Sequence, residues 1–184
     1  MRTIAPLRAL VAVSGLAGFA ACGSDTTTAP IPTRPALAVA TQCRNVDGSI
    51  GESLTMLPGF GQPADLEGSI AGDITGQAFG KITTWSYKPK NNSYDITLEH
   101  RFVMPDGEIH TSDKASLKST DAVYHNTAGW STFDGRLTIT SGTGAYAGAS
   151  GVLRVNGIFG AAITVNYPFD GLQLTYAGRL CLPT

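Results

Sequence analysis

Two side chains that could carry out acid–base chemistry, His100 and Asp113, lie on either side of a predicted β-hairpin. Residues 94–118, YDITLEHRFVMPDGEIHTSDKASLK, contain Asp106-Gly107, a dipeptide that favours a two-residue hairpin turn. With these two residues as the loop, His100 is expected directly opposite Asp113 on an otherwise apolar, inward face. Such a carboxylate raises the histidine pKa and fixes its tautomer. The pair is therefore a candidate acid–base or ligand-orienting group, or else a structural pair of buried charges.

The same register divides the rest of the hairpin into two faces. It pairs Met104 with Ile109 on the inner face and Glu99 with Lys114 on the outer face. Aromatic side chains at strand spacing are candidates for lining the same interior as His100 and Asp113, although such aromatics more often form plain core. The candidate ligand-binding aromatics are Phe79, Trp85, Tyr87, Phe102 and Tyr176.

Other catalytic and cofactor signatures are absent from the sequence. The three histidines, His100, His110 and His125, lack the spacing of a zinc site, so we expect no metal. Glycines 142, 144 and 148 read G-x-G-x-x-x-G, one residue longer than a dinucleotide-binding loop, and an alternating strand pattern follows them instead of a helix. We expect no cofactor, and interpret these glycines as a turn between strands.

Between Cys43 and Leu182 the sequence predicts an all-β domain. Short stretches alternate polar and apolar residues, and glycine or other turn residues separate them. The expected strands, about eight in number, fall within residues 66–75, 79–87, 94–104, 108–118, 133–140, 151–159 and 171–180, with a weaker one at 121–125. The alternation is compatible with either a sandwich or a barrel.

The stretch LTITSGTGAYAGASGVLRVNG resembles a signature of the allene oxide cyclase and dirigent barrel superfamily. In that family a strand leads into G-T-G-x-[YF]-x-G-A-x-G and then into the next strand, and residues 142–151 match this pattern. The resemblance covers about residues 66–180. It implies a single antiparallel eight-stranded β-barrel, an apolar ligand or reactive intermediate in its interior, and dimers or trimers. The plant catalytic residues do not map onto this sequence, because the motif lies outside them.

The N-terminus resembles the signal of a bacterial lipoprotein. Residues 1–21 combine Arg2 and Arg8 with an apolar run, which is typical of an export signal, and FAAC ends in Cys22 like a lipobox. The resemblance implies acylation of Cys22 and anchoring in a lipid bilayer, the outer membrane if the cell is Gram-negative, because Gly23 is not the aspartate associated with inner-membrane retention. The alternative is an ordinary secretory peptide. Residues 22–42 are expected to form a Thr/Pro/Ala tether, and 43–184 the barrel domain.

The remaining cysteines indicate a disulfide. If lipid occupies Cys22, Cys43 and Cys181 are left at the two ends of the domain in an oxidising compartment. A bond between them would connect the first segment of the domain to its last strand. The alternative is two free thiols.

Charge and composition narrow the functions that we expect. Removing the two signal arginines from the 13 basic residues leaves 11 against 14 acidic ones, a formal charge of −3, and the sequence shows no basic stripe. Nucleic acid is therefore not an expected partner. We expect an anchored barrel that binds a small apolar ligand. The alternatives are an enzyme, namely a cyclase or isomerase that acts on an apolar substrate in the barrel lumen, and a non-catalytic scaffold or surface interaction protein.

Overall fold

The computed structural model describes residues 40–55, 63–119, 129–161 and 171–184. This part of the chain is all-β, with two short 3-10 turns and no α-helix. The elements are β1 (Thr41–Leu54), β2 (Ala64–Gly72), β3 (Gly76–Lys88), η1 (Pro89–Asn91), β4 (Ser93–Met104), β5 (Gly107–Ser119), β6 (Gly129–Gly142), η2 (Gly144–Tyr146), β7 (Ser150–Ala161) and β8 (Gly171–Pro183).

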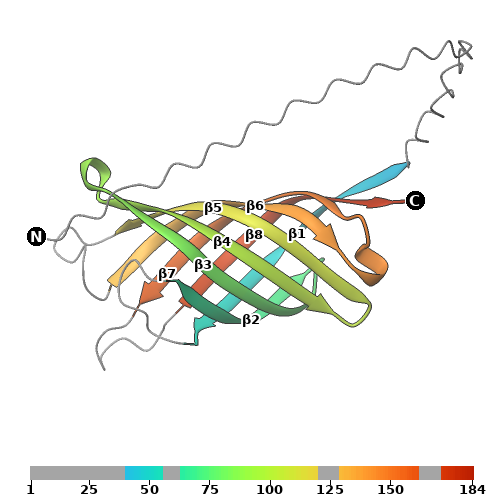
Figure 1. The fold of residues 1–184 in the computed structure, drawn as a ribbon, viewed down its shortest axis with the longest axis horizontal. Helices are drawn as coiled ribbons and strands as arrows, with labels where there is room; N and C mark the ends of the chain where they lie inside the picture. The colour runs from blue at the N-terminus through green and yellow to red at the C-terminus, as the bar shows by residue number, and fades with distance from the viewer. Residues whose placement is uncertain (1–39, 56–62, 120–128, 162–170) are drawn as a thin grey trace, which may run out of the picture. The chain divides into compact units, whose positions relative to one another are not determined.

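The eight strands form one closed antiparallel barrel in which each strand pairs with its neighbours in the sequence (Figure 1). Closure comes from β1 and β8, whose pairing extends from Thr41 opposite Pro183 to Ser53 opposite Gly171. Since closure leaves no unpaired strand edge, the backbone donors and acceptors of every strand can be satisfied within the sheet. The predicted eight-stranded barrel is confirmed.

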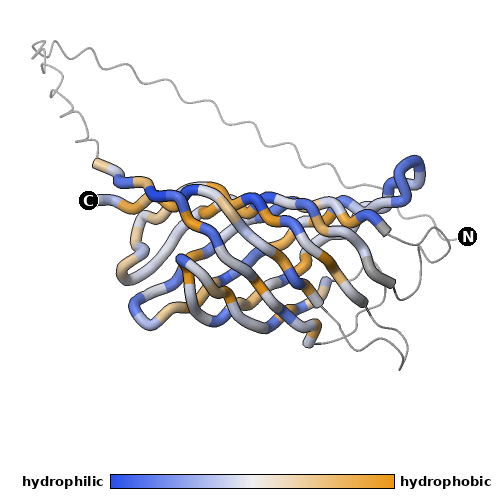
Figure 2. The backbone as a smooth tube through the Cα atoms, turned by 180° about the vertical axis from the view of Figure 1, so that it is seen from behind, coloured by the Kyte–Doolittle hydropathy of each residue, from blue (hydrophilic) through white to orange (hydrophobic). Residues whose placement is uncertain are grey.

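Hydrophobic and hydrophilic residues alternate along the strands (Figure 2), and the buried positions are mainly the hydrophobic ones. On β4, for example, Ile96, Leu98 and Phe102 are buried, whereas Glu99 and Arg101 are exposed. Side chains from all eight strands build one continuous core. The interior is therefore filled by apolar side chains at the level of the strand centres.

The first strand, β1, was not among the expected strands. Its sequence, TQCRNVDGSIGESL, is interrupted by Gly48 and Gly51, and its apolar residues are sparse. Pairing with β2 on one side and β8 on the other compensates for this weak local pattern. The weak strand expected at 121–125 lies outside the described residues.

The expected register of the β4–β5 hairpin is wrong by two residues. The loop is Pro105-Asp106 instead of Asp106-Gly107, so Met104 lies opposite Gly107 and Val103 opposite Glu108. A type I′ turn needs positive φ at both central residues, but Asp106 keeps a negative φ and only Gly107 is positive, at 156°. Proline in the first loop position, with glycine after the loop, suits an ordinary turn instead.

Glycines 142–151 form the connection between β6 and β7, as the sequence predicts. Gly144 and Gly148 have φ angles of 57° and 75°, in the left-handed region that favours glycine. Atoms of this loop also bind the β4–β5 turn: the amide of Ala145 donates to the carbonyl of Asp106 at 2.8 Å. The segment is therefore a structural corner of the barrel.

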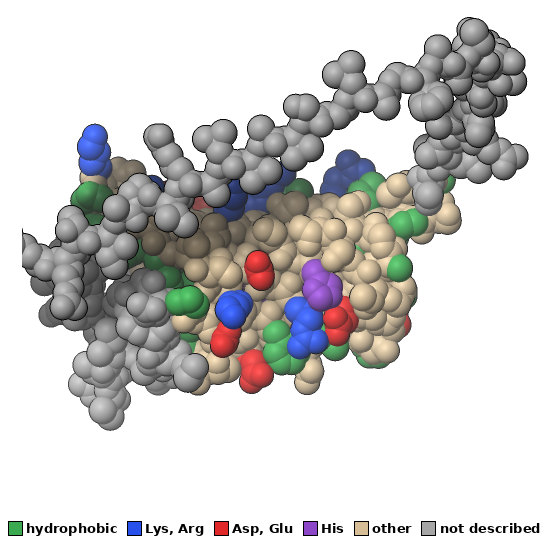
Figure 3. All heavy atoms as spheres, viewed as in Figure 1, with side chains coloured by type: hydrophobic (Ala, Val, Ile, Leu, Met, Phe, Trp, Pro, Cys, Tyr) green, Lys and Arg blue, Asp and Glu red, His purple; other side chains and the backbone are tan. Residues whose placement is uncertain are grey.

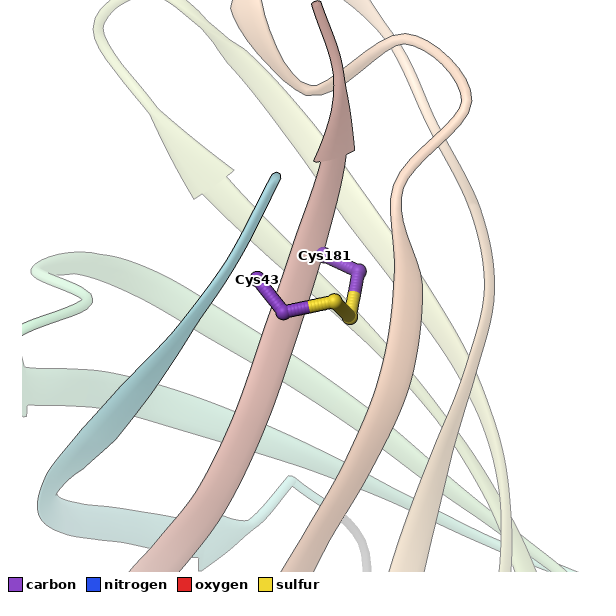
Figure 4. The surroundings of a disulfide bond; sticks show 2 residues. All are labelled: Cys43 and Cys181. Atoms are coloured by element: carbon purple, nitrogen blue, oxygen red, sulfur yellow. A yellow bond between two sulfur atoms is a disulfide. The ribbon is translucent and has the colours of Figure 1, made fainter. Parts of the chain in front are cut away.

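A disulfide joins Cys43 of β1 to Cys181 of β8 (Figure 4). The two residues are direct cross-strand partners in the pair of strands that closes the barrel. The bond links positions 138 residues apart in the sequence. The predicted pairing of these two cysteines is confirmed.

Candidate functional site

His100 and Asp113 meet inside the barrel, although they are not directly opposite each other. His100 faces Thr111 across the hairpin and Asp113 faces Leu98, so the pair is diagonal. Their side chains share the inner face, and Nδ1 of His100 lies 2.6 Å from Oδ2 of Asp113. The contact survives the register error because a shift of two residues leaves every side chain on its original face.

A third ionisable residue, Glu52 of β1, completes this cluster and was missed in the sequence. Its Oε2 lies 3.1 Å from Nε2 of His100, and the hydroxyl of Thr111 donates to Oδ2 of Asp113 at 2.8 Å. A side chain on Gly80 would come within 3.0 Å of the imidazole and 3.1 Å of the Glu52 carboxylate, so this glycine leaves the space in which they meet. The period-two spacing of Ile50, Glu52 and Leu54 was the available signal that Glu52 faces inward.

The buried polar cluster (Glu52, His100, Thr111 and Asp113) is almost completely shielded from solvent. The side chains of Glu52, His100 and Asp113 are at most 2% exposed. Burial alone lowers the pKa of His100, but the charge of Glu52 and the hydrogen bonds that His100 donates to both carboxylates outweigh it and raise this pKa from 6.5 to about 10. His100 is therefore an imidazolium at neutral pH, and both of its N–H groups donate to carboxylates.

One cation faces two carboxyl groups in this cluster. Burial raises the pKa of Asp113 despite the opposing effect of its hydrogen bond with His100. Among the described side chains, Oδ1 of Asp113 and Oε1 of Glu52 are buried polar atoms without a hydrogen-bond partner. The cluster thus carries unsatisfied acceptors and a carboxylate that is easier to protonate than usual.

The surroundings of the cluster favour a structural role over acid–base catalysis. The ring of Phe102 stacks on His100, with centroids 5.5 Å apart and planes 13° from parallel. A general acid or base must come within hydrogen-bond reach of its substrate, and Phe102 and the carboxylates occupy the space around the imidazole. In this geometry the cluster connects β1, β4 and β5 across the interior.

Trp85 and Tyr87, two of the expected ligand-lining aromatics, gather at the barrel end next to η1. The pairing of β3 with β4 shifts between Ile82 and Thr84, a β-bulge in which Thr83 and Thr84 both contact the Thr97 hydroxyl, at 2.7 and 2.6 Å. The extra residue reverses the inside–outside alternation, so Trp85 and Tyr87 fall on the inner face.

Two further aromatics that sequence reasoning missed, Tyr94 and Phe159, join them. The ring centroid of Trp85 lies 5.9 Å from that of Phe159 and 6.0 Å from that of Tyr94. The ring centroid of Tyr87 lies 4.9 Å from that of Tyr94, and Tyr87 is 40% exposed. Because β3 and β7 are not neighbours in the barrel, the contact between Trp85 and Phe159 crosses the lumen. We name these four residues the aromatic cluster.

The other candidate aromatics lie elsewhere. Phe102 belongs to the core beside His100. Tyr176 is buried toward the opposite end, where its hydroxyl accepts a hydrogen bond from the amide of Ile74 at 3.0 Å. Phe79 does not line the interior, contrary to expectation: its ring lies on the outer wall with the guanidinium of Arg101 4.6 Å from its centroid. The candidates therefore do not form a single cavity.

Metal coordination finds no support in the geometry of the described residues, among which no group of three or more His, Cys, Asp or Glu side chains is arranged to hold an ion. His110 contacts Glu108 on the barrel wall, with 3.1 Å between Nε2 and Oε2, and His125 lies outside the described residues. Within the same ranges, no helix is long and apolar enough to cross a membrane.

Comparison with known proteins leaves the family open. No family model matches the sequence, and no curated protein matches it either. The eight-stranded barrel agrees with the fold that the glycine signature implies, but membership of the allene oxide cyclase and dirigent superfamily remains a prediction.

Proposed function

We propose that this protein is an envelope lipoprotein, anchored through Cys22, whose barrel binds a small apolar molecule at the aromatic cluster. The observation that carries the proposal is the convergence of Trp85, Tyr87, Tyr94 and Phe159 at one end of the lumen. Ligand sites in barrels commonly lie at the mouth, and aromatic side chains with a few polar groups commonly line them.

The chemistry of the aromatic cluster suits a ligand that is mainly apolar. Tyr87 is exposed, Trp85 and Tyr94 are half-buried, and Phe159 is buried, so the cluster forms a gradient from solvent to core. The tyrosine and tryptophan rings offer apolar faces on which an apolar ligand can pack. The buried polar cluster lies deeper, and we assign it no contact with the ligand.

Energy transfer from tryptophan to a bound probe tests this proposal. The chain has two tryptophans, so Trp130→Phe leaves Trp85 as the sole donor. We expect the apolar dye N-phenyl-1-naphthylamine to bind this variant and to quench Trp85. Adding Tyr87→Ala should weaken dye binding about three- to tenfold, which corresponds to the loss of one aromatic contact of about 1 kcal/mol.

The control for the dye experiment is Phe79→Ala. It removes an aromatic ring from the outer wall, where the ring contacts Arg101, and should leave the dye affinity unchanged. Equal weakening by Tyr87→Ala and Phe79→Ala, or no transfer from Trp85, would contradict binding at the aromatic cluster.

Anchoring is tested separately by Cys22→Ser. We expect this variant to leave the membrane fraction and appear as soluble protein, because acylation at Cys22 is the proposed attachment. Continued membrane association of the variant would refute the lipoprotein assignment without affecting the dye experiment.

A non-catalytic scaffold is the second candidate, and the filled middle of the barrel favours it. Phe102, Ile82 and Leu98 are at most 1% exposed, and the buried polar cluster occupies the space among the strands at the same level. Absence of dye binding would favour this candidate. The cyclase or isomerase alternative receives less support, because His100 and Asp113 are enclosed by protein atoms.

A further inference from the structure

Four basic side chains form a continuous row on the outer wall of the barrel. Lys114 of β5 lies directly opposite Arg136 of β6, which in turn lies opposite Arg154 of β7. Arg154 faces Ala177 of β8, and Arg179 follows two residues further along the same face. All four side chains are exposed. We name this row the basic stripe (Lys114, Arg136, Arg154 and Arg179).

The linear sequence shows no row of basic residues, but the folded barrel has one. The four residues are spread over 66 positions of the sequence, and only the pairing of β5, β6, β7 and β8 brings them together. Adjacent strands lie about 4.8 Å apart, so three successive strand spacings place the cations along roughly 15 Å of wall.

Within the described part of the chain, none of the four stripe cations has an ion-pair partner. Two other exposed cations have such a partner: Lys88 lies 3.4 Å from Asp95, and Arg101 lies 3.1 Å from Glu108. Like charges directly opposite each other in a sheet are unfavourable. A bound anion would relieve this repulsion, and the stripe therefore points to a partner of opposite charge.

The stripe lines a groove of about 1050 Å³. Between the cations the groove wall consists of small side chains on neighbouring strands, among them Thr97, Ser116 and Ala177. Two carboxylates also line it: Asp95, which contacts Lys88, and Asp134, two residues before Arg136. The basic side chains are long and their neighbours in the groove are small. An extended ligand could therefore lie along the groove in contact with several of the cations. Elsewhere, Figure 3 shows basic and acidic side chains intermixed on the face that it presents.

We propose that the basic stripe binds an acidic glycan chain that carries sulfate or phosphate groups. Guanidinium groups bind such tetrahedral oxyanions through paired hydrogen bonds, and Ser and Thr hydroxyls can bind sugar hydroxyls. The groove contains no aromatic residue on which nucleic-acid bases could stack. The exposed large hydrophobic residue of the described chain, Tyr87, lines no part of the groove, whereas large exposed apolar side chains are what insert into a bilayer interface.

Binding of dextran sulfate to the purified barrel tests this proposal, with unsulfated dextran as the neutral probe and dextran phosphate to separate the two oxyanions. At about 150 mM salt, we expect the charged dextrans to bind and the neutral one not to bind. Arg136→Gln/Arg154→Gln should weaken binding at least about tenfold and flatten its salt dependence. Because both side chains are exposed, we expect no loss of thermal stability.

The matched control is Lys81→Gln/Lys90→Gln, which removes two exposed cations outside the groove. It changes the net charge by the same amount and should alter the affinity less than about twofold, because long-range attraction is screened at this salt concentration. Lys114→Gln/Arg179→Gln provides a second variant of the stripe.

Three results would overturn the proposal: no binding of the charged dextrans, equal weakening by the stripe and control variants, or tighter binding of another polyanion. Oligothymidylate and phosphatidylglycerol vesicles are the competing probes, and preference for either would assign the stripe to nucleic acid or to a membrane surface. The dye experiment on the aromatic cluster is unaffected by any of these outcomes.

Discussion

Raising the pH from about 5 to about 11.5 should reduce the free energy of unfolding by about 5 kcal/mol through the deprotonation of His100. Its pKa is about 10 in the folded protein, against 6.5 for the unperturbed imidazole. Each pH unit between these values corresponds to about 1.4 kcal/mol. Since the folded-state pKa is the higher one, this stabilisation is complete below pH 6.5 and is lost as the pH rises through about 10.

Urea unfolding, followed by tryptophan fluorescence with the disulfide intact, measures this effect. Tyrosines and lysines titrate in the same range, so the control is Glu52→Gln/Asp113→Asn, which keeps the shape of the buried polar cluster but removes both negative charges. Without these charges nothing raises the pKa of His100, and the variant should lack the 5 kcal/mol component. Identical pH dependence of wild type and control between about pH 5 and about pH 11.5 would refute the charged state that we assign to His100.

Removing the cation alone provides an independent check of the same cluster. His100→Leu leaves Glu52 and Asp113 buried without a positive partner, which should cost about 3–5 kcal/mol at pH 7. The loss should shrink as the pH falls, because burial raises the pKa of Asp113 and its protonation removes one of the buried charges. A variant as stable as the wild type would show that the carboxylates do not depend on His100.

Three further predictions concern the barrel frame, each measured as a free energy of unfolding. Replacing Cys43 and Cys181 by Ala opens a connection of 138 residues and should cost about 4–5 kcal/mol; a change below 1 kcal/mol would contradict this. Gly144→Ala should cost about 2 kcal/mol, since its φ is 57° and a Cβ would meet a carbonyl of the β4–β5 turn, whereas Gly51→Ala, with open space around it, should be neutral. Tyr176→Phe removes the buried hydroxyl that accepts from the β2–β3 turn and should cost about 1–2 kcal/mol, with no loss if water replaces it.

The sequence by itself determined the strands with clear alternation and the direction in which their side chains point. Seven of the eight strands contain a segment that the period-two pattern predicts, and His100 and Asp113 were correctly placed on one inner face. This placement was correct despite the error in the turn, because side chains along a strand alternate between faces with a period of two residues. A two-residue error in a hairpin turn changes cross-strand partners but keeps each side chain on its face. The disulfide followed from the positions of Cys43 and Cys181 once Cys22 was assigned to the lipid anchor.

The turn preferences of single residues did not predict the β4–β5 loop, because two of these preferences favour different loops. Asp106-Gly107 favours one loop and Pro105 favours another, and the structure follows the proline. The turn also contacts the β6–β7 connection, as in the hydrogen bond from the amide of Ala145 to the carbonyl of Asp106. Such contacts are formed by residues that are distant in the sequence.

Only the tertiary structure decided which side chains meet. Glu52 reaches His100 because closure of the barrel brings β1 near the β4–β5 hairpin, and β1 has too few apolar residues to be recognised as a strand. A single extra residue at Thr83 places Trp85 on the inner face and Phe79 on the outer one, whereas strict alternation would place both on the same face. The basic stripe, likewise, depends on the register of four strands, because its charges are isolated from one another along the chain and adjacent only across the sheet.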